Sequence, residues 1–256
     1  MGRLDGKVVV ITGTSSGQGQ VAAVRFAQEG AKIAGCGRSA ERQQETARLV
    51  AEAGGEMHST VLDLTDPEAV VAWMDEVAAH FGGIDVLYNN AGEPKFGPPD
   101  VMPVEDWKFT IANELDIVFY ATRAAWPHLK KRGAGANIIM VGSVSGMIGV
   151  GGLPQSAHSA TKQGIVGMTR QLAAEGALDG IRVNCVSPGL IDTPATSQFI
   201  EMGAPGPLGS LMGRLPLGRP GVSIEVVNAA LFLASDEASY ITGVNLPVDG
   251  GLTVLQ

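Results

Sequence analysis

His158 and Lys162 lie four residues apart in "SAHSATKQG", residues 156–164, at the start of an expected helix. Residues at i and i+4 share one helix face, so an imidazole and an ammonium group are expected side by side. Histidine can act as a general base near neutral pH. Ser143, at the end of an apolar strand segment, adds a hydroxyl. These three groups could manage the proton of a reacting hydroxyl or carbonyl oxygen.

A glycine-rich turn, "ITGTSSGQG", follows the first apolar strand segment and opens the first helix. Such a turn lets backbone N–H groups approach a pyrophosphate at a helix N-terminus. Glycines that merely make a tight turn are the alternative, but the order strand, turn, helix favours a dinucleotide site. The predicted cofactor-binding residues of the turn are Gly13, Ser15, Ser16, Gln18 and Gly19.

The second strand segment ends at Gly37, followed by Arg38. NAD selectivity normally uses an Asp or Glu there to accept the ribose hydroxyls, whereas a nearby Arg accommodates a 2′-phosphate. Arg38 therefore favours NADP(H), with NAD(H) as the other possibility. A solvated loop arginine is the alternative interpretation.

Strand-like and helix-like segments alternate through the chain. Continuous apolar strands that alternate with helices are typical of a parallel sheet covered on both faces. We therefore predict an α/β, doubly wound, Rossmann-like parallel sheet of about seven strands in one domain, 1–256. The expected strands include 58–64, and one long helix is expected over about 104–131. Residues 190–220 form a long irregular segment with apolar side chains, for which we predict a substrate lid, with a plain mobile loop as the alternative.

These motifs, in this order, resemble the short-chain dehydrogenase/reductase family over nearly the whole chain. The family's glycine turn corresponds to "TGTSSGQG", its "NNAG" motif to residues 89–92, and its nicotinamide-binding segment to "SPGLIDTP". The resemblance implies catalytic roles for Ser143 and for Asn113, which would hold a proton-relay water. It also implies cofactor contacts by Asp63, Leu64, Asn90, Ala91, Gly92, Lys162, Pro188, Gly189, Ile191 and Thr193.

One position departs from the family pattern. The family motif YxxxK reads "HSATK" here, so His158 stands at the Tyr position and Lys162 at the Lys position. In relatives, the Tyr exchanges a proton with the substrate oxygen, while the Lys lowers the pKa of that Tyr and binds the nicotinamide ribose. Beside Lys162 and an oxidised nicotinamide, we expect a mostly neutral imidazole. Such a ring accepts a proton from an alcohol more readily than it donates one to a ketone.

The length of the side chain is the larger difficulty, because the imidazole nitrogen of a histidine extends roughly 2 Å less far from the backbone than the phenol oxygen of a tyrosine. A misplacement of about 1 Å can cost about 100-fold in rate. A bridging water could close the gap. Three explanations stay open: redox chemistry with His158 as acid and base, loss of hydride transfer in a binding protein or non-redox lyase or isomerase, or a deliberate Tyr→His substitution in an active enzyme.

Composition and charge limit the partners, the location and the metal sites that we expect. The formal net charge is −8, and the longest basic run is "LKKRG", so nucleic acid is not an expected partner. The sequence shows neither a secretory signal pattern nor a membrane span, which favours a cytoplasmic protein. The four histidines and two cysteines show no metal-ligand spacing. We expect an oxidoreductase acting on a small, apolar secondary alcohol or ketone. The resemblance implies a homo-oligomer, a tetramer.

Overall fold

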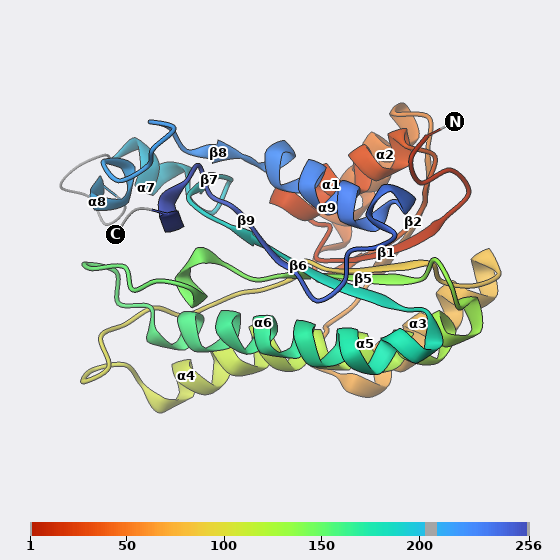
Figure 1. The fold of residues 1–256 in the computed structure, drawn as a ribbon, viewed down its shortest axis with the longest axis horizontal. Helices are drawn as coiled ribbons and strands as arrows, with labels where there is room; N and C mark the ends of the chain where they lie inside the picture. The colour runs from red at the N-terminus through yellow and green to blue at the C-terminus, as the bar shows by residue number, and fades with distance from the viewer. Residues whose placement is uncertain (1, 203–208, 255–256) are drawn as a thin grey trace.

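A parallel sheet of seven strands forms the centre of the computed structural model, which describes residues 2–202 and 209–254 (Figure 1). The strand order is β3-β2-β1-β4-β5-β6-β9. This arrangement confirms the predicted doubly wound α/β fold. The strands are β1 (Val8–Thr12), β2 (Lys32–Gly37), β3 (Glu56–Val61), β4 (Val86–Asn89), β5 (Asn137–Val141), β6 (Arg182–Pro188) and β9 (Asn245–Val248).

Helices cover both faces of the sheet, with α1, α2 and α9 on one side and α3 to α6 on the other (Figure 1). The helices are α1 (Gly17–Gln28), α2 (Ala40–Glu52), α3 (Pro67–Phe81), α4 (Val104–Ile111), α5 (Ile117–Arg132), α6 (Ser156–Gly176), α7 (Ser197–Glu201), α8 (Gly209–Met212) and α9 (Ser223–Ala234). Among the described residues, none of the helices has both the length and the apolar character needed to cross a membrane.

Alternation along β1 explains the two layers of the core. Val8 and Val10 are buried with side chains of α3 and α5, whereas Val9 and Ile11 are buried with side chains of α1 and α9. Successive strand side chains point to opposite faces, so a strand covered on both sides is apolar throughout. Cys36 and Cys185 belong to this core as free thiols, and burial raises the pKa of Cys36 to about 12.

Two predicted boundaries were wrong. Strand β3 ends at Val61 rather than residue 64, because its partner β2 ends at Gly37, which pairs with Val61. The long helix predicted over 104–131 is interrupted by a π-helical turn, Ala112–Asp116, between α4 and α5. Within it, the Asn113 side chain donates to the Phe109 carbonyl at 3.0 Å, a bond that competes with the regular helical pattern.

The segment 190–220 contains more structure than predicted. Two short strands, β7 (Ile191–Asp192) and β8 (Gly221–Val222), pair in parallel, and α7 and α8 lie between them in sequence. Leu211 and Leu215 are buried in a small apolar cluster with Val144, the residue after Ser143. Part of the predicted lid, 203–208, lies outside the described residues. The described part is therefore anchored beside the turn that carries Ser143.

Candidate active site

A cleft of about 470 Å³ lies where the chain order of the sheet reverses, between β1 and β4. Ligands of open parallel sheets bind at such a switch point, beyond the carboxyl ends of the strands. Most residues predicted to bind a cofactor line this cleft. They are Gly13, Ser15, Ser16, Gln18, Arg38, Asp63, Leu64, Asn90, Ala91, Gly92 and Thr193, and the predicted catalytic residue Asn113 lines it too.

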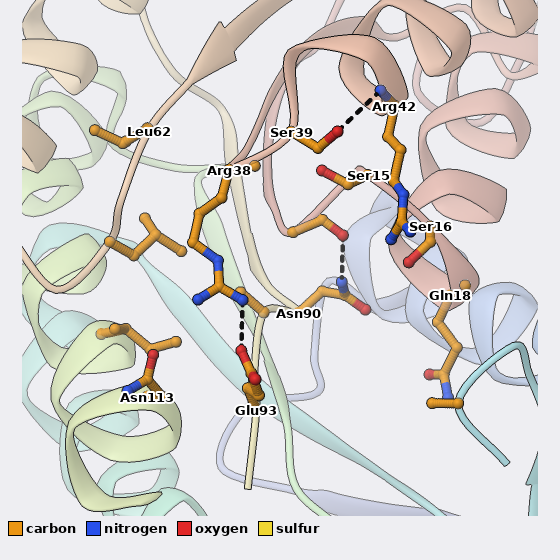
Figure 2. Close-up of a pocket in the computed structure, with 18 of the residues that line it drawn as sticks. Ser15, Ser16, Gln18, Arg38, Ser39, Arg42, Leu62, Asn90, Glu93 and Asn113 are labelled. Carbon is orange, nitrogen blue, oxygen red and sulfur yellow. Dashed lines mark hydrogen bonds and ion pairs between the residues drawn. The ribbon is translucent and has the colours of Figure 1, made fainter. Parts of the chain in front are cut away.

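The glycine turn and the segment after β4 are tied together at the floor of the cleft. Thr12 Oγ1 accepts hydrogen bonds from the backbone N–H groups of Asn90 and Ala91, each at 3.0 Å. The Asn90 side chain donates to the carbonyl of Gly13, a bond drawn in Figure 2. A Cβ at Gly19 would lie 2.1 Å from the Gly13 oxygen. Gly19 therefore does not line the cleft but permits the close turn that forms it.

The turn has the features expected of a phosphate cradle. Helix α1 begins at Gly17 directly after Ser16, so its free N–H groups face the cleft. Gln18 Oε1 is buried without a hydrogen-bond partner among the described residues. A ribose hydroxyl of a bound dinucleotide could donate to this oxygen, while the N–H groups of the turn could donate to its pyrophosphate.

Basic side chains stand at the end of β2. Arg38 and Arg42 both line the cleft, and Arg38 forms an ion pair with Glu93 across it (Figure 2). Gly37 occupies the position where NAD selectivity normally places a carboxylate, and a Cβ there would lie 2.0 Å from Ser15 Oγ, so a larger residue would require the Ser15 side chain to move. The sequence prediction included Arg38 and missed Arg42.

Asp63 and Leu64 lie just beyond the end of β3, at the rim of the cleft. Asp63 Oδ1 accepts from the Thr65 backbone N–H at 3.0 Å and from the Thr65 hydroxyl at 2.8 Å. These two hydrogen bonds hold the pKa of Asp63 below its usual value. The carboxylate is thus ionised and fixed in position at neutral pH.

The predicted nicotinamide-binding segment is only partly at the cleft. Thr193 lines it, while Pro188, Gly189 and Ile191 do not. The Gly189 N–H donates to the Val248 carbonyl at 3.0 Å, and a Cβ there would lie 2.7 Å from the Asp249 Cα. These three residues therefore shape the backbone that presents Thr193.

His158 and Lys162 lie on one face of α6, as predicted, and both meet a carboxylate that the sequence analysis missed. His158 Nδ1 lies 2.8 Å from Glu114 Oε1 and 3.0 Å from Oε2. Lys162 Nζ lies 3.8 Å from Glu114 Oε1 and donates to the Val141 carbonyl at 3.2 Å. Thr161 Oγ1 donates to Glu114 Oε2 at 2.6 Å. Three side chains of α6 thus converge on Glu114.

The Glu114 carboxylate is buried, with its side chain 2% exposed. Burial raises the pKa of Glu114, but the hydrogen bond from His158 and the charge of Lys162 outweigh that effect, so the pKa lies below its usual value. A buried carboxylate is tolerated when it is paired and hydrogen-bonded, and Glu114 meets both conditions.

This cluster adjoins the cofactor cleft. A Cβ at Gly92, which lines the cleft, would lie 3.5 Å from Lys162 Nζ and 3.6 Å from Glu114 Oε1. Val141, whose carbonyl accepts from Lys162, also lines the cleft. Lys162 therefore stands directly behind the cleft wall, although neither it nor His158 is among the lining residues.

Ser143 lies two residues beyond β5, and its hydroxyl accepts from the Ser145 N–H at 3.1 Å. The turn after it packs on α6, since a Cβ at Gly146 would lie 2.7 Å from the Gln163 nitrogen. Among the described residues, no hydrogen bond joins Ser143 to His158. Asn113 lines the cleft beside Glu114, within the π-helical turn, a feature often found at functional sites.

The chain matches known proteins over nearly its whole length. The family model described as enoyl-(acyl carrier protein) reductase matches residues 13–253. The chain is 39% identical to a 3-oxoacyl-(acyl-carrier-protein) reductase of Thermotoga maritima, over 98% of this chain and 100% of that protein. It is 38% identical to 3beta-hydroxysteroid dehydrogenase 1 of Eggerthella lenta, over 98% and 95%.

Solved structures show the same fold. A short-chain type dehydrogenase/reductase from Mycobacterium marinum superposes with a TM-score of 0.93 at 33% identity, covering 98% of this chain and 97% of that one. A structure from Agrobacterium tumefaciens with bound NADP has a TM-score of 0.89 at 31% identity, covering 98% of each chain. A 7α-hydroxysteroid dehydrogenase complexed with NADH has a TM-score of 0.90 at 28% identity, covering 97% and 95%.

Proposed function

Because the chain belongs to the short-chain dehydrogenase/reductase family, whose members are oxidoreductases, we propose that it interconverts a secondary alcohol and a ketone with a nicotinamide coenzyme. The observation that carries this proposal is the position of His158 and Lys162. They lie together on α6, with Lys162 behind the cleft wall at Gly92. This arrangement supports a contact of Lys162 with the coenzyme ribose at that wall and an acid–base role for its neighbour His158.

The coenzyme, when bound, supplies the hydride donor or acceptor, and the side chains manage the oxygen. Ser143 would hydrogen-bond the substrate oxygen, and His158 would exchange the proton with it, directly or through a water held by Asn113. Lys162 would hold the nicotinamide ribose. The cofactor contacts would come from the cleft residues described above, with Thr193 at the nicotinamide end.

Deuterium transfer tests the reaction type. With NADPH carrying deuterium at the transferable C4 position, a ketone substrate should yield an alcohol with deuterium on its carbinol carbon, detected by mass spectrometry. A non-redox lyase or isomerase would leave the label on the coenzyme. Recovery of unlabelled product from a substrate that is turned over would reject the oxidoreductase proposal.

Arg38 and Arg42 support a preference for NADP(H). Both guanidinium groups line the cleft beyond β2, and a guanidinium pairs strongly with a phosphate. Binding of a 2′-phosphate would require Arg38 to exchange its exposed partner Glu93, and such a surface pair contributes little to stability.

Replacing Arg38 with alanine should weaken NADPH binding about tenfold, because one charge-assisted hydrogen bond to the phosphate is lost. NADH binding should stay within about twofold, since NADH has no 2′-phosphate. Coenzyme fluorescence titration measures both dissociation constants. Arg48→Ala is the matched control, because Arg48 lies on helix α2, which begins two residues after Arg38, but pairs with Glu45 and Glu52 on the surface. Equal loss for NADPH and NADH would contradict the assignment.

An apolar substrate suits the surroundings of His158. The exposed ring of Phe96 meets the imidazole edge-on, with ring centroids 5.9 Å apart. Residues 190–220 would serve as the lid, with Met202 and Leu217 exposed on their described part. Leu211 and Leu215 would anchor it beside Ser143.

Exposed apolar side chains support a homo-oligomer, a tetramer. Val104 and Trp107 on α4 and Phe119 on α5 are exposed, as is Tyr240 near the last strand. Val104 and Trp107 lie three residues apart on α4, a spacing that places them on one side of the helix, where a second copy could cover them. Sedimentation equilibrium should give a multiple of the 26.4 kDa chain mass, and a monomer mass at assay concentrations would reject this proposal.

A further inference from the structure

We propose that Glu114 is a positioning residue that fixes the imidazole of His158 and balances its positive charge when the ring holds a proton. This inference rests on the proposed function, because it gives His158 the acid–base role. It explains how the His158 imidazole could hold a proton although the Lys162 ammonium group lies on the same face of α6.

The carboxylate contacts the ring through one nitrogen only. Glu114 reaches His158 Nδ1 with both oxygens, at 2.8 and 3.0 Å. An ionised carboxylate only accepts hydrogen bonds, so the neutral ring must carry its hydrogen on Nδ1. The lone pair then lies on Nε2, the nitrogen that makes no hydrogen bond to any described residue. Glu114 thereby selects the tautomer that can accept a proton from an alcohol.

The carboxylate is itself held from two further directions. Thr161 donates to Oε2 at 2.6 Å, and Lys162 Nζ lies 3.8 Å from Oε1. The side chain is 2% exposed, so Glu114 has little freedom to turn away. A rigid acceptor fixes the orientation of the ring, which matters because small misplacements of an acid–base group cost large factors in rate.

Charge is balanced through the proton transfer. In alcohol oxidation, an oxidised coenzyme, when bound, would supply the acceptor for the carbinol hydride, so that the alcohol would become the ketone. His158 Nε2 would take the hydroxyl proton. The Glu114 carboxylate, which lies beside both His158 Nδ1 and Lys162 Nζ, faces the resulting imidazolium, and the ring later releases its proton to water. Glu114 offsets the repulsion from Lys162 and stays ionised throughout.

The groups around the ring define the expected pH response. Glu114 faces it from the π-helical turn, Lys162 comes from α6, and the uncharged ring of Phe96 comes from the loop after β4. Removing the negative charge of Glu114 leaves Lys162 as the only charged residue among these groups. The protonated imidazole should then become less favourable.

Glu114→Gln is the direct test, since it keeps the shape of the side chain and removes the charge. By NMR, the titration midpoint of the His158 ring should move down, because the one negative charge in contact with the ring is removed. The signal is assigned by its loss in His158→Ala. Melting temperature and NADPH binding verify that the variant is folded. An unchanged midpoint would overturn the inference, whether or not the protein turns over a substrate.

A double-mutant cycle adds the kinetic readout. Glu114→Gln should lower kcat about 10- to 100-fold, the size of a lost hydrogen bond to a charged group, with the KM for NADPH within about threefold. The alcohol-oxidation rate should reach its plateau at lower pH. In the His158→Tyr background, the same substitution should cost less than about threefold, because a phenol needs no such partner. Equal losses in both backgrounds would contradict the inference, because Glu114 would then support the structure without acting on His158. Absence of turnover in the unaltered protein would instead reject the proposed function.

Discussion

The His158→Ala variant is expected to lose about 100- to 10,000-fold in kcat, the usual contribution of a positioned acid–base group. NADPH binding should change by less than about threefold, because His158 does not line the coenzyme cleft. The loss should appear in both reaction directions, since one group exchanges the same proton in each. Steady-state rates and coenzyme titration measure the two quantities.

His128→Ala is the matched control for this loss. His128 also pairs with a carboxylate, Asp75, but it lies on α5 away from the cleft. Its replacement should leave kcat within about twofold. A His158→Ala variant that keeps more than a tenth of the rate would contradict the role of the imidazole.

Gly19→Val should remove saturable coenzyme binding over the range that saturates the unaltered protein. The first carbon of the new side chain would lie 2.1 Å from the Gly13 oxygen and 2.5 Å from Asn90 Nδ2. Both are fixed parts of the cleft floor, so the glycine turn must move. Overpacking of this kind costs about 1–3 kcal/mol, equivalent to about a 10- to 100-fold weaker binding.

Gly167→Ala controls for the general effect of enlarging a glycine. Gly167 lies in α6, exposed, and a Cβ there meets open space. This variant should bind NADPH normally. If Gly19→Val binds the coenzyme as tightly as Gly167→Ala does, the glycine turn is not the phosphate cradle.

Local sequence patterns predicted the fold because each pattern reflects one physical effect, such as burial of a strand or capping of a helix. The apolar run of β1 predicted a strand buried on both faces. Likewise, α3 begins after Asp66, whose carboxylate accepts from the N–H groups of Glu68 and Ala69, the usual role of an aspartate at that position. The end of β3 was not predictable from its own residues. It depends on where its partner β2 ends.

The missed part of the site depends on contacts between segments far apart in sequence. Glu114 and His158 are 44 residues apart, and the polar pattern of "IANELDI" does not indicate that the carboxylate is buried. The available signals were the acidic residue next to Asn113 and the histidine at position 158, two unusual residues in one site. The expectation of a neutral imidazole considered only Lys162 and the nicotinamide. It omitted the carboxylate that contacts the ring.

The proposed lid and the π-helical turn illustrate a second limit of prediction from sequence. The apolar side chains of 190–220 were expected to cover a ligand, yet Leu211 and Leu215 are buried in a cluster with Val144. The interruption at 112–116 arises inside a segment whose periodicity fits one long helix. Such features depend on tertiary packing, which the local pattern does not contain.

The most direct measurement of the central claim, that His158 supports hydride transfer in this chain, is coenzyme absorbance over a panel of apolar secondary alcohols and ketones. The unaltered protein is assayed beside His158→Tyr. We predict turnover of at least one pair by the unaltered protein, with the imidazole as acid and base. Tight NADPH binding without turnover in the unaltered protein, together with turnover by His158→Tyr, would contradict the claim.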